Sequence, residues 1–141
     1  MISFGGAIYN KGNLTISNTS FIESKGDKYT YGAGIYNDGN ANMENGIIAN
    51  SYSKEESKGS AIYNKGNFTL RNSIIENNTV KRLNFNYIQG NIFNSGLLIA
   101  VGNIFRNNSG YYEQPNSEYE GSPNIYTESD RKSGSAGMPR P

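Results

Sequence analysis

Side chains able to catalyse a reaction are scarce in this sequence of 141 residues. It contains no histidine and no cysteine, which disfavours a thiol nucleophile, a catalytic triad and a transition-metal site. Paired carboxylates facing one groove could hydrolyse a polysaccharide, and a calcium-dependent lyase would need a carboxylate cluster. Aspartate, however, occurs only at Asp27, Asp38 and Asp130. We therefore expect no catalytic residue, no metal site, no cofactor and no enzyme activity.

Two other residue types recur at a regular spacing and could serve recognition or structure. The aromatic series is Tyr9, Tyr36, Tyr63 and Phe93, and the asparagine series is Asn10, Asn37, Asn64 and Asn94. A stripe of aromatic side chains could bind sugars or a partner protein, or could stack and shield a sheet. Asparagines placed one above another can hydrogen-bond from side chain to side chain, and we expect this ladder to be structural.

Both series belong to a motif that recurs four times, in coils that start near residues 5, 32, 59 and 90. In the first coil the motif reads Gly-Gly-Ala-Ile-Tyr-Asn-Lys-Gly. Its isoleucines, at positions 8, 35, 62 and 92, are separated by 27, 27 and 30 residues. A period of this length indicates stacked supersecondary units rather than one globular core.

Apolar residues follow each isoleucine in aligned columns. The first column is Leu14, Ala41, Phe68 and Leu98, the second is Ile16, Met43, Leu70 and Ala100, and the third is Phe21, Ile48, Ile75 and Phe105. Within a coil these residues alternate with the strand period of two, and no helical pattern extends over a useful length. Segments rich in glycine and asparagine, such as 10–13, separate two or three short strands per coil, because these residues tolerate positive φ in tight turns.

The fold predicted from this pattern is all-β, a single-stranded parallel β-helix of about four coils of 27–30 residues. Successive coils would stack about 4.8 Å apart, with the isoleucines pointing inward and the aromatic residues after them pointing outward. A leucine-rich repeat has a similar period. Its asparagine follows the leucines, however, whereas here asparagine precedes Leu14 and Ile16.

Polar connections at 24–31, 51–58 and 79–89 would emerge at the same point of each coil and line one edge of the stack. Insertions in repeat proteins often build the binding face, although a charged edge can also be only a soluble rim. We expect the repeats to span residues 1–127, with a partial fifth coil near 121. The polar remainder, 128–141, is expected to be a disordered tail.

Composition limits the partners of the chain. Its net charge of +1 predicts no nucleic-acid partner, and no apolar stretch is long enough to span a membrane. The sequence starts almost inside its first coil, and an uncapped β-helix end exposes apolar side chains and unpaired strand groups. This suggests either further coils or end-to-end stacking with another copy.

The tetrapeptide formed by Gly5, Gly6, Ala7 and Ile8, together with the Phe-x-x-Asn pattern from Phe105 to Asn108, resembles a known repeat family. These residues resemble the polymorphic outer membrane protein repeat, which adhesin-like proteins share, and the resemblance covers about residues 5–108. It implies a right-handed, pectin-lyase-like parallel β-helix that is secreted or displayed at the cell surface. It also implies a role in adhesion, with the tetrapeptides involved and a glycan or a host or matrix protein as the partner.

Three functions follow from these observations. The first is a non-catalytic, adhesin-like segment outside the cell that presents a binding surface. The second is a structural stalk that spaces another domain from the surface. The third, a polysaccharide-degrading enzyme of the same fold class, would need a carboxylate pair in coils beyond this sequence.

Overall fold

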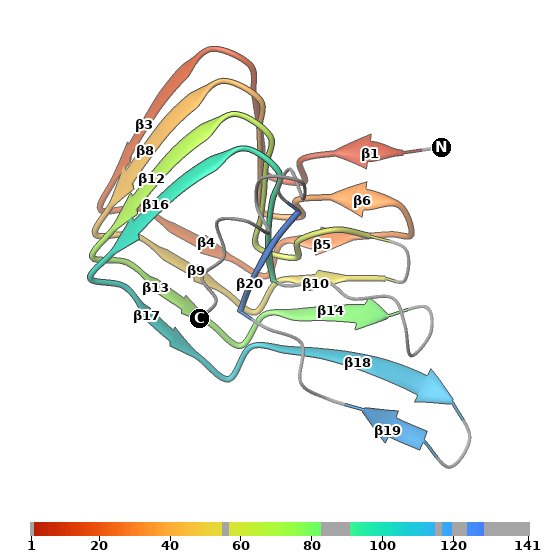
Figure 1. Cartoon of the computed structure of the whole chain (residues 1–141). Coiled ribbons are helices and arrows are strands. Elements are labelled where there is room, and N and C mark those ends of the chain that lie inside the picture. Colours follow the sequence, from red (N-terminus) through yellow and green to blue (C-terminus); the bar gives the residue numbers. More distant parts are fainter. Residues whose placement is uncertain (1, 55–56, 83–90, 115–116, 120–123, 129–141) are drawn as a thin grey trace, which may run out of the picture.

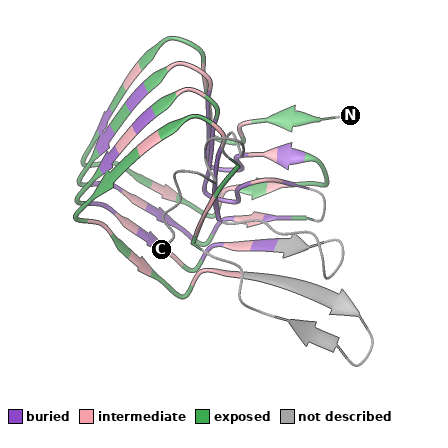
Figure 2. Ribbon diagram, viewed as in Figure 1, coloured by how far each residue is buried: buried purple, intermediate pink, exposed green. Residues whose placement is uncertain are grey.

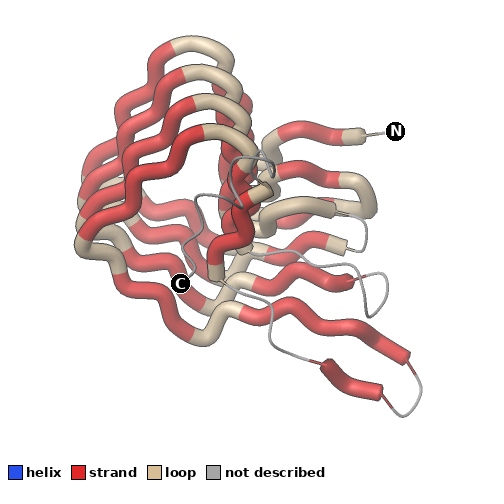
Figure 3. The backbone as a smooth tube through the Cα atoms, viewed as in Figure 1, coloured by secondary structure: helices blue, strands red, loops and turns tan. Residues whose placement is uncertain are grey.

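A computed structural model describes residues 2–54, 57–82, 91–114, 117–119 and 124–128 of the chain (Figure 1). Within these ranges every regular element is a β-strand, and the strands stack in parallel as the chain winds into a solenoid (Figure 3). The predicted all-β parallel β-helix is therefore confirmed. No helix in the described part of the chain is long and apolar enough to cross a membrane.

Three parallel sheets form the walls of the solenoid and are numbered here in chain order. Sheet 1 contains β2 (Ile8–Asn10), β7 (Ile35–Asn37), β11 (Ile62–Asn64), β15 (Ile92–Asn94) and β20 (Ile125–Thr127). Sheet 2 contains β3 (Asn13–Ser17), β8 (Asn40–Glu44), β12 (Asn67–Arg71) and β16 (Leu97–Val101). Sheet 3 contains β4 (Ser20–Ile22), β9 (Ile47–Ala49), β13 (Ile74–Glu76) and β17 (Ile104–Arg106). Each level of this stack, one strand from each sheet, is called a rung below.

Two further sheets form an arm that extends beside the solenoid, on the right of Figure 1. Sheet 4 contains β5 (Lys25–Gly26), β10 (Tyr52–Ser53), β14 (Thr79–Arg82) and β18 (Ser109–Gln114), and β19 (Ser117–Tyr119) pairs with β18 in the antiparallel sense. The short sheet contains β1 (Ser3–Phe4) and β6 (Thr30–Tyr31). The chain thus leaves the solenoid along sheet 4 and returns along the short sheet.

Equivalent residues of successive coils lie opposite one another, as the aligned columns predicted. Ile62 pairs with both Ile35 and Ile92, and Phe68 pairs with Leu98. In β20, Ile125 lies opposite Ile92, so the segment predicted as a partial fifth coil adds a fifth strand to sheet 1. The expected disordered tail falls, from residue 129 onward, outside the described residues.

The core inside the solenoid contains the predicted columns except Ala100, which is exposed, and Figure 2 marks the buried positions along the strands. Phe68, Ile62 and Leu70 of the third rung are at most 1% exposed, and each such side chain contributes about 1.5–3 kcal/mol by leaving water. In the first and fourth rungs Ile16 and Ile92 are buried, but other core residues there, such as Leu14 and Leu98, are only partly buried. The stack is therefore best packed in its middle rungs.

The expectation of two or three strands per coil is too low, because the polar connections also form strands. Segments 24–31 and 51–58 contain β5, β6 and β10. Their inward positions carry small residues, Gly26 and Ser53, opposite Val80, and Ser53 and Val80 are fully buried. Strands with so little apolar content lack the pattern that identifies a half-buried strand from sequence.

At the corner between sheets 1 and 2, glycine is needed because the backbones of successive rungs approach closely there, and not because the backbone adopts a positive φ. Positive φ occurs instead at asparagines of the next corners, including Asn45 (56°) and Asn77 (57°), a conformation that asparagine tolerates better than most residues. A Cβ added at Gly39 would lie 2.2 Å from the Gly12 carbonyl oxygen, and one added at Gly66 would lie 2.2 Å from that of Gly39. Only glycine allows successive rungs to approach this closely.

Candidate functional site

The four aromatic residues of the sequence motif form a continuous stack of rings along sheet 1. The ring centroids of Tyr9 and Tyr36, of Tyr36 and Tyr63, and of Tyr63 and Phe93 are each 5.2 Å apart. The last two pairs are nearly parallel, with interplanar angles of 7° and 3°. Tyr126 extends the stack at 5.1 Å from Phe93, tilted by 45°.

Most of this stripe is buried, so for three of its four members the structure agrees with the alternative in which the rings stack and shield the sheet, rather than with an exposed binding surface. Tyr36 is 6% exposed, Tyr63 is 8% exposed and Phe93 is 2% exposed, whereas Tyr9 is 52% exposed. The rings do point away from the solenoid core and form a second apolar cluster, against which Tyr31 packs. Pointing outward from one layer does not expose a side chain when another layer covers it.

The covering layer comes from the arm. The Tyr31 ring stacks on Tyr63, with centroids 4.9 Å apart and an angle of 14°. The Lys58 ammonium lies 5.4 Å from the Tyr31 centroid and 4.9 Å from the Phe93 centroid, distances that favour cation–π attraction. Among the described residues, Tyr9 is therefore the one member of the stripe whose ring is exposed.

Burial also changes how readily the tyrosines of the stripe ionise. Burial raises the pKa of Tyr36 from 10.0 to about 12, with smaller contributions from the Asp38 carboxylate and neighbouring tyrosines. Burial likewise raises the pKa of Tyr63, although a hydrogen bond with Ser95 acts in the opposite direction. Both phenols therefore stay protonated in the folded protein at pH values where they would ionise in an unfolded chain.

We expect the free energy of unfolding to fall as the pH rises from 10 to 12. In this window the unfolded chain loses the Tyr36 proton while the folded chain keeps it, so the unfolded state binds fewer protons and gains stability with pH. The stabilisation is fully present below pH 10 and is lost as the pH passes through 12, at about 1.4 kcal/mol per pH unit for one such group. Melting temperatures measured across this range should fall less steeply for Tyr36→Phe than for the native protein. Parallel slopes would contradict the shift.

The asparagine series forms a ladder of side-chain hydrogen bonds at the corner between sheets 1 and 2. Each Nδ2 donates to Oδ1 of the next rung, from Asn10 to Asn37 at 2.7 Å, from Asn37 to Asn64 at 2.8 Å and from Asn64 to Asn94 at 2.7 Å. The same Nδ2 atoms donate to carbonyls of the turns, as Asn37 does to Gly39 and Asn67. Asn37 and Asn64 are fully buried, so these bonds satisfy groups that have no access to water.

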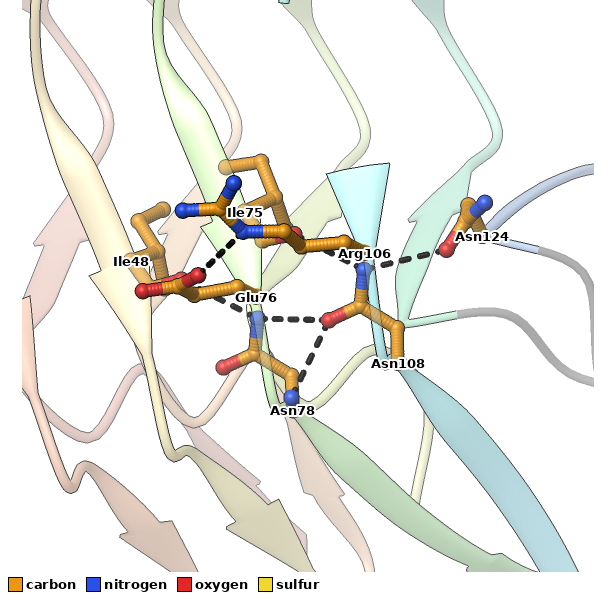
Figure 4. A network of polar contacts seen from close by, with 7 residues as sticks. All are labelled: Ile48, Ile75, Glu76, Asn78, Arg106, Asn108 and Asn124. Carbon is orange, nitrogen blue, oxygen red and sulfur yellow. Dashed lines mark hydrogen bonds and ion pairs between the residues drawn. The ribbon is translucent and has the colours of Figure 1, made fainter. Parts of the chain in front are cut away.

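A second ladder, which the sequence analysis missed, lies at the corner between sheets 3 and 4 (Figure 4). Asn78 Nδ2 donates to Asn108 Oδ1 at 3.0 Å, and Asn108 Nδ2 donates to Asn124 Oδ1 at 3.0 Å. Asn78 Oδ1 accepts the backbone N–H of Ser51 at 2.9 Å, one rung below. This column is hard to recognise in the sequence because it holds serine in the second coil and asparagine only in the third and fourth coils. Beside it, Arg106 Nε donates to Glu76 Oε1 at 2.6 Å.

The residues of the two tetrapeptides at 5–8 and 105–108, which resemble the repeat family, make contacts that stabilise the fold. Gly5 has a φ of 75°, and a Cβ there would lie 2.4 Å from the Ile8 carbonyl oxygen. Ile8 and Phe105 pack against the core, and Asn108 belongs to the second ladder. A Cβ at Gly6 would meet the Ala33 carbonyl oxygen of the next rung at 2.2 Å. Ala7, next to it, donates its N–H to the carbonyls of Ala33 and Gly34.

The outer face of sheet 4 carries a hollow of about 600 Å³. It is lined by Lys25, Gly26 and Asp27 of the first coil and by Tyr52 and Lys54 of the second. Lys54 Nζ lies 3.4 Å from Asp27 Oδ1. The hollow therefore lies on the edge that sequence analysis associated with the polar connections, and it combines an aromatic ring with charges of both signs.

Acidic residues in the described ranges do not gather into a metal site, since no group of three or more carboxylate side chains there could hold an ion. Asp38, the aspartate of the coil face, lies 3.9 Å from Lys11 Nζ. No protein-family model, curated protein or solved structure matches the chain. The repeat family thus rests on the resemblance of the motifs, and function has to be argued from geometry.

Proposed function

We propose that this chain is a non-catalytic, adhesin-like β-helix segment that works outside the cell and presents a binding surface. The observation that carries this proposal is the hollow of about 600 Å³ on the arm, lined by charged, aromatic and backbone groups. Its volume lies in the range of about 300–1,000 Å³ that is usual for ligand sites. The resemblance to surface-displayed repeat proteins supports the extracellular location.

The solenoid would act as the rigid frame for this surface. Two asparagine ladders connect its rungs at the corners, and the ring stack joins the arm to sheet 1 through Tyr31 and Tyr63. The backbone positions that carry the outward side chains of the arm are therefore held in place, which lowers the conformational cost of binding. The buried stripe contributes stiffness, with Tyr9 as its one exposed member.

A structural stalk is the second candidate, and the continuity of the ladders favours it. The Asn10–Asn94 ladder runs through four successive rungs without interruption. A stack bonded in this way keeps its shape along the whole axis. It could therefore hold other domains at a distance without binding any ligand itself.

A binding screen of the folded chain separates these candidates. Residues 1–141 would be checked by circular dichroism and then tested against polysaccharides and extracellular-matrix proteins, with product analysis of every polysaccharide that binds. Binding without cleavage supports the adhesin-like function, and cleavage overturns the non-catalytic assignment. Absence of binding by a well-folded sample supports the stalk.

A further inference from the structure

We propose that the hollow on the outer face of sheet 4 binds an acidic polysaccharide, one whose sugar residues carry carboxylate groups. This inference rests on the proposed function and names the ligand class of its binding surface. It rests on four side chains that the first and second coils contribute to the arm, namely Lys25, Asp27, Tyr52 and Lys54.

The strand register explains why these four side chains share one face. Lys25 pairs with Tyr52, and Gly26 pairs with Ser53, while the Lys54 N–H donates to the Gly26 carbonyl at 3.2 Å. Because Ser53 is buried and side chains alternate along a strand, its neighbours Tyr52 and Lys54 face outward. The same alternation around Gly26 turns Lys25 and Asp27 outward on the rung below.

The two lysines supply positive charge that the described part of the chain leaves accessible. Lys25 is exposed and forms no ion pair with any described residue. Lys54 is paired with Asp27, but the side chains are 51% and 89% exposed, and such a pair contributes little in water. A carboxylate entering the hollow can accept hydrogen bonds from both ammonium groups at a small cost in lost pairing.

Tyr52 and Asp27 favour a sugar over other anions. Tyr52 lines the hollow half-buried, and a tyrosine ring offers an apolar face and a polar tip to a ligand that has both characters. The Asp27 carboxylate can accept hydrogen bonds from hydroxyl groups, whereas it would repel the closely spaced charges of a nucleic acid or polyphosphate. A ligand with one carboxylate and several hydroxyls per residue matches this lining.

The test measures binding of the folded chain to hyaluronan by isothermal titration calorimetry, with dextran as the neutral polysaccharide and inorganic polyphosphate as the charge-only competitor. The site variant is Lys25→Gln combined with Lys54→Gln. The control variant, Lys65→Gln combined with Arg71→Gln, removes the same charge from exposed positions of the solenoid. Circular dichroism and melting temperature establish that both variants fold.

We expect hyaluronan to bind and dextran not to bind. Affinity should fall about tenfold or more in the site variant, because charge-assisted hydrogen bonds are lost, and should stay unchanged in the control variant. Equal losses in both variants, or equally effective competition by polyphosphate, would overturn the assigned site and ligand class. If hyaluronan fails but another glycan or a matrix protein binds, the ligand class is wrong and the proposed function stands. If a folded sample binds none of them, both fail together.

Discussion

Asn64→Ala should lower the free energy of unfolding by about 4 kcal/mol, because several buried polar groups lose their partners at about 1–3 kcal/mol each. Asn64 Nδ2 donates to Asn94 Oδ1 at 2.7 Å, to the Leu97 carbonyl at 2.9 Å and to the Gly66 carbonyl at 3.1 Å. Its Oδ1 accepts from Asn37 at 2.8 Å. Equilibrium urea unfolding followed by circular dichroism measures the change.

Asn67→Ala is the matched control for this prediction. Asn67 also belongs to an asparagine row, since its Nδ2 donates to Asn40 Oδ1 at 2.9 Å, but the row is exposed. Water can replace that bond, and we expect a change within about 0.5 kcal/mol. Similar losses for the two variants would mean that burial of the ladder is not the source of its stabilisation.

Gly66→Ala should destabilise the fold by about 3 kcal/mol or more, through overpacking against a backbone that cannot move aside. The added Cβ would lie 2.2 Å from the Gly39 carbonyl oxygen and 2.8 Å from the Gly39 nitrogen. That carbonyl already accepts the Asn67 N–H at 2.9 Å, so a shift would also weaken the pairing between rungs. The melting temperature of the purified variant measures the effect.

Gly12→Ala tests whether the clash, rather than the loss of glycine, is responsible. Gly12 occupies the same turn position in the first coil, and a Cβ added there would have no atom within 4 Å. Its φ does not lie in the left-handed region, so alanine should leave stability unchanged or raise it by up to about 1 kcal/mol. A melting temperature lowered as far as in Gly66→Ala would refute the explanation by close approach.

The solenoid could be predicted from sequence because its inward residues are apolar and recur with one period. Ile8, Ile35, Ile62 and Ile92 alone fix the register of sheet 1, and a shift by one residue would turn every core side chain toward water. The arm was missed because its inward positions are small or polar, as at Ser53. A strand of the stack can be predicted from sequence when apolar residues recur with the coil period. Sheet 4 keeps the period but lacks the apolar residues.

The candidate site was harder to predict than the fold. The alternation of side chains gave the outward direction of Tyr36 and Tyr63, but their burial depends on Tyr31 and Lys58, which belong to a different part of the coil. Contacts between layers depend on how the chain returns along the arm, and a single sequence does not encode this in any local pattern. The hollow at Tyr52 lies instead on the outgoing strands of sheet 4, where residues of two successive coils come together.

The direction of the asparagine ladders gives the molecule an electrical polarity along its axis. Backbone hydrogen bonds between rungs run both ways, as from Asp38 down to Asn10 and from Ile35 up to Ala61, so their dipoles largely cancel. In the ladder, the side-chain amides of Asn10, Asn37 and Asn64 all donate toward the higher rung, whereas the row of Asn40 and Asn67 donates toward the lower rung but is exposed, so water screens it. The dipoles of the ladder therefore add, leaving partial negative charge at the first coil and partial positive charge at the last. The two ends of the solenoid should differ in their attraction for ions even where their surface residues are alike.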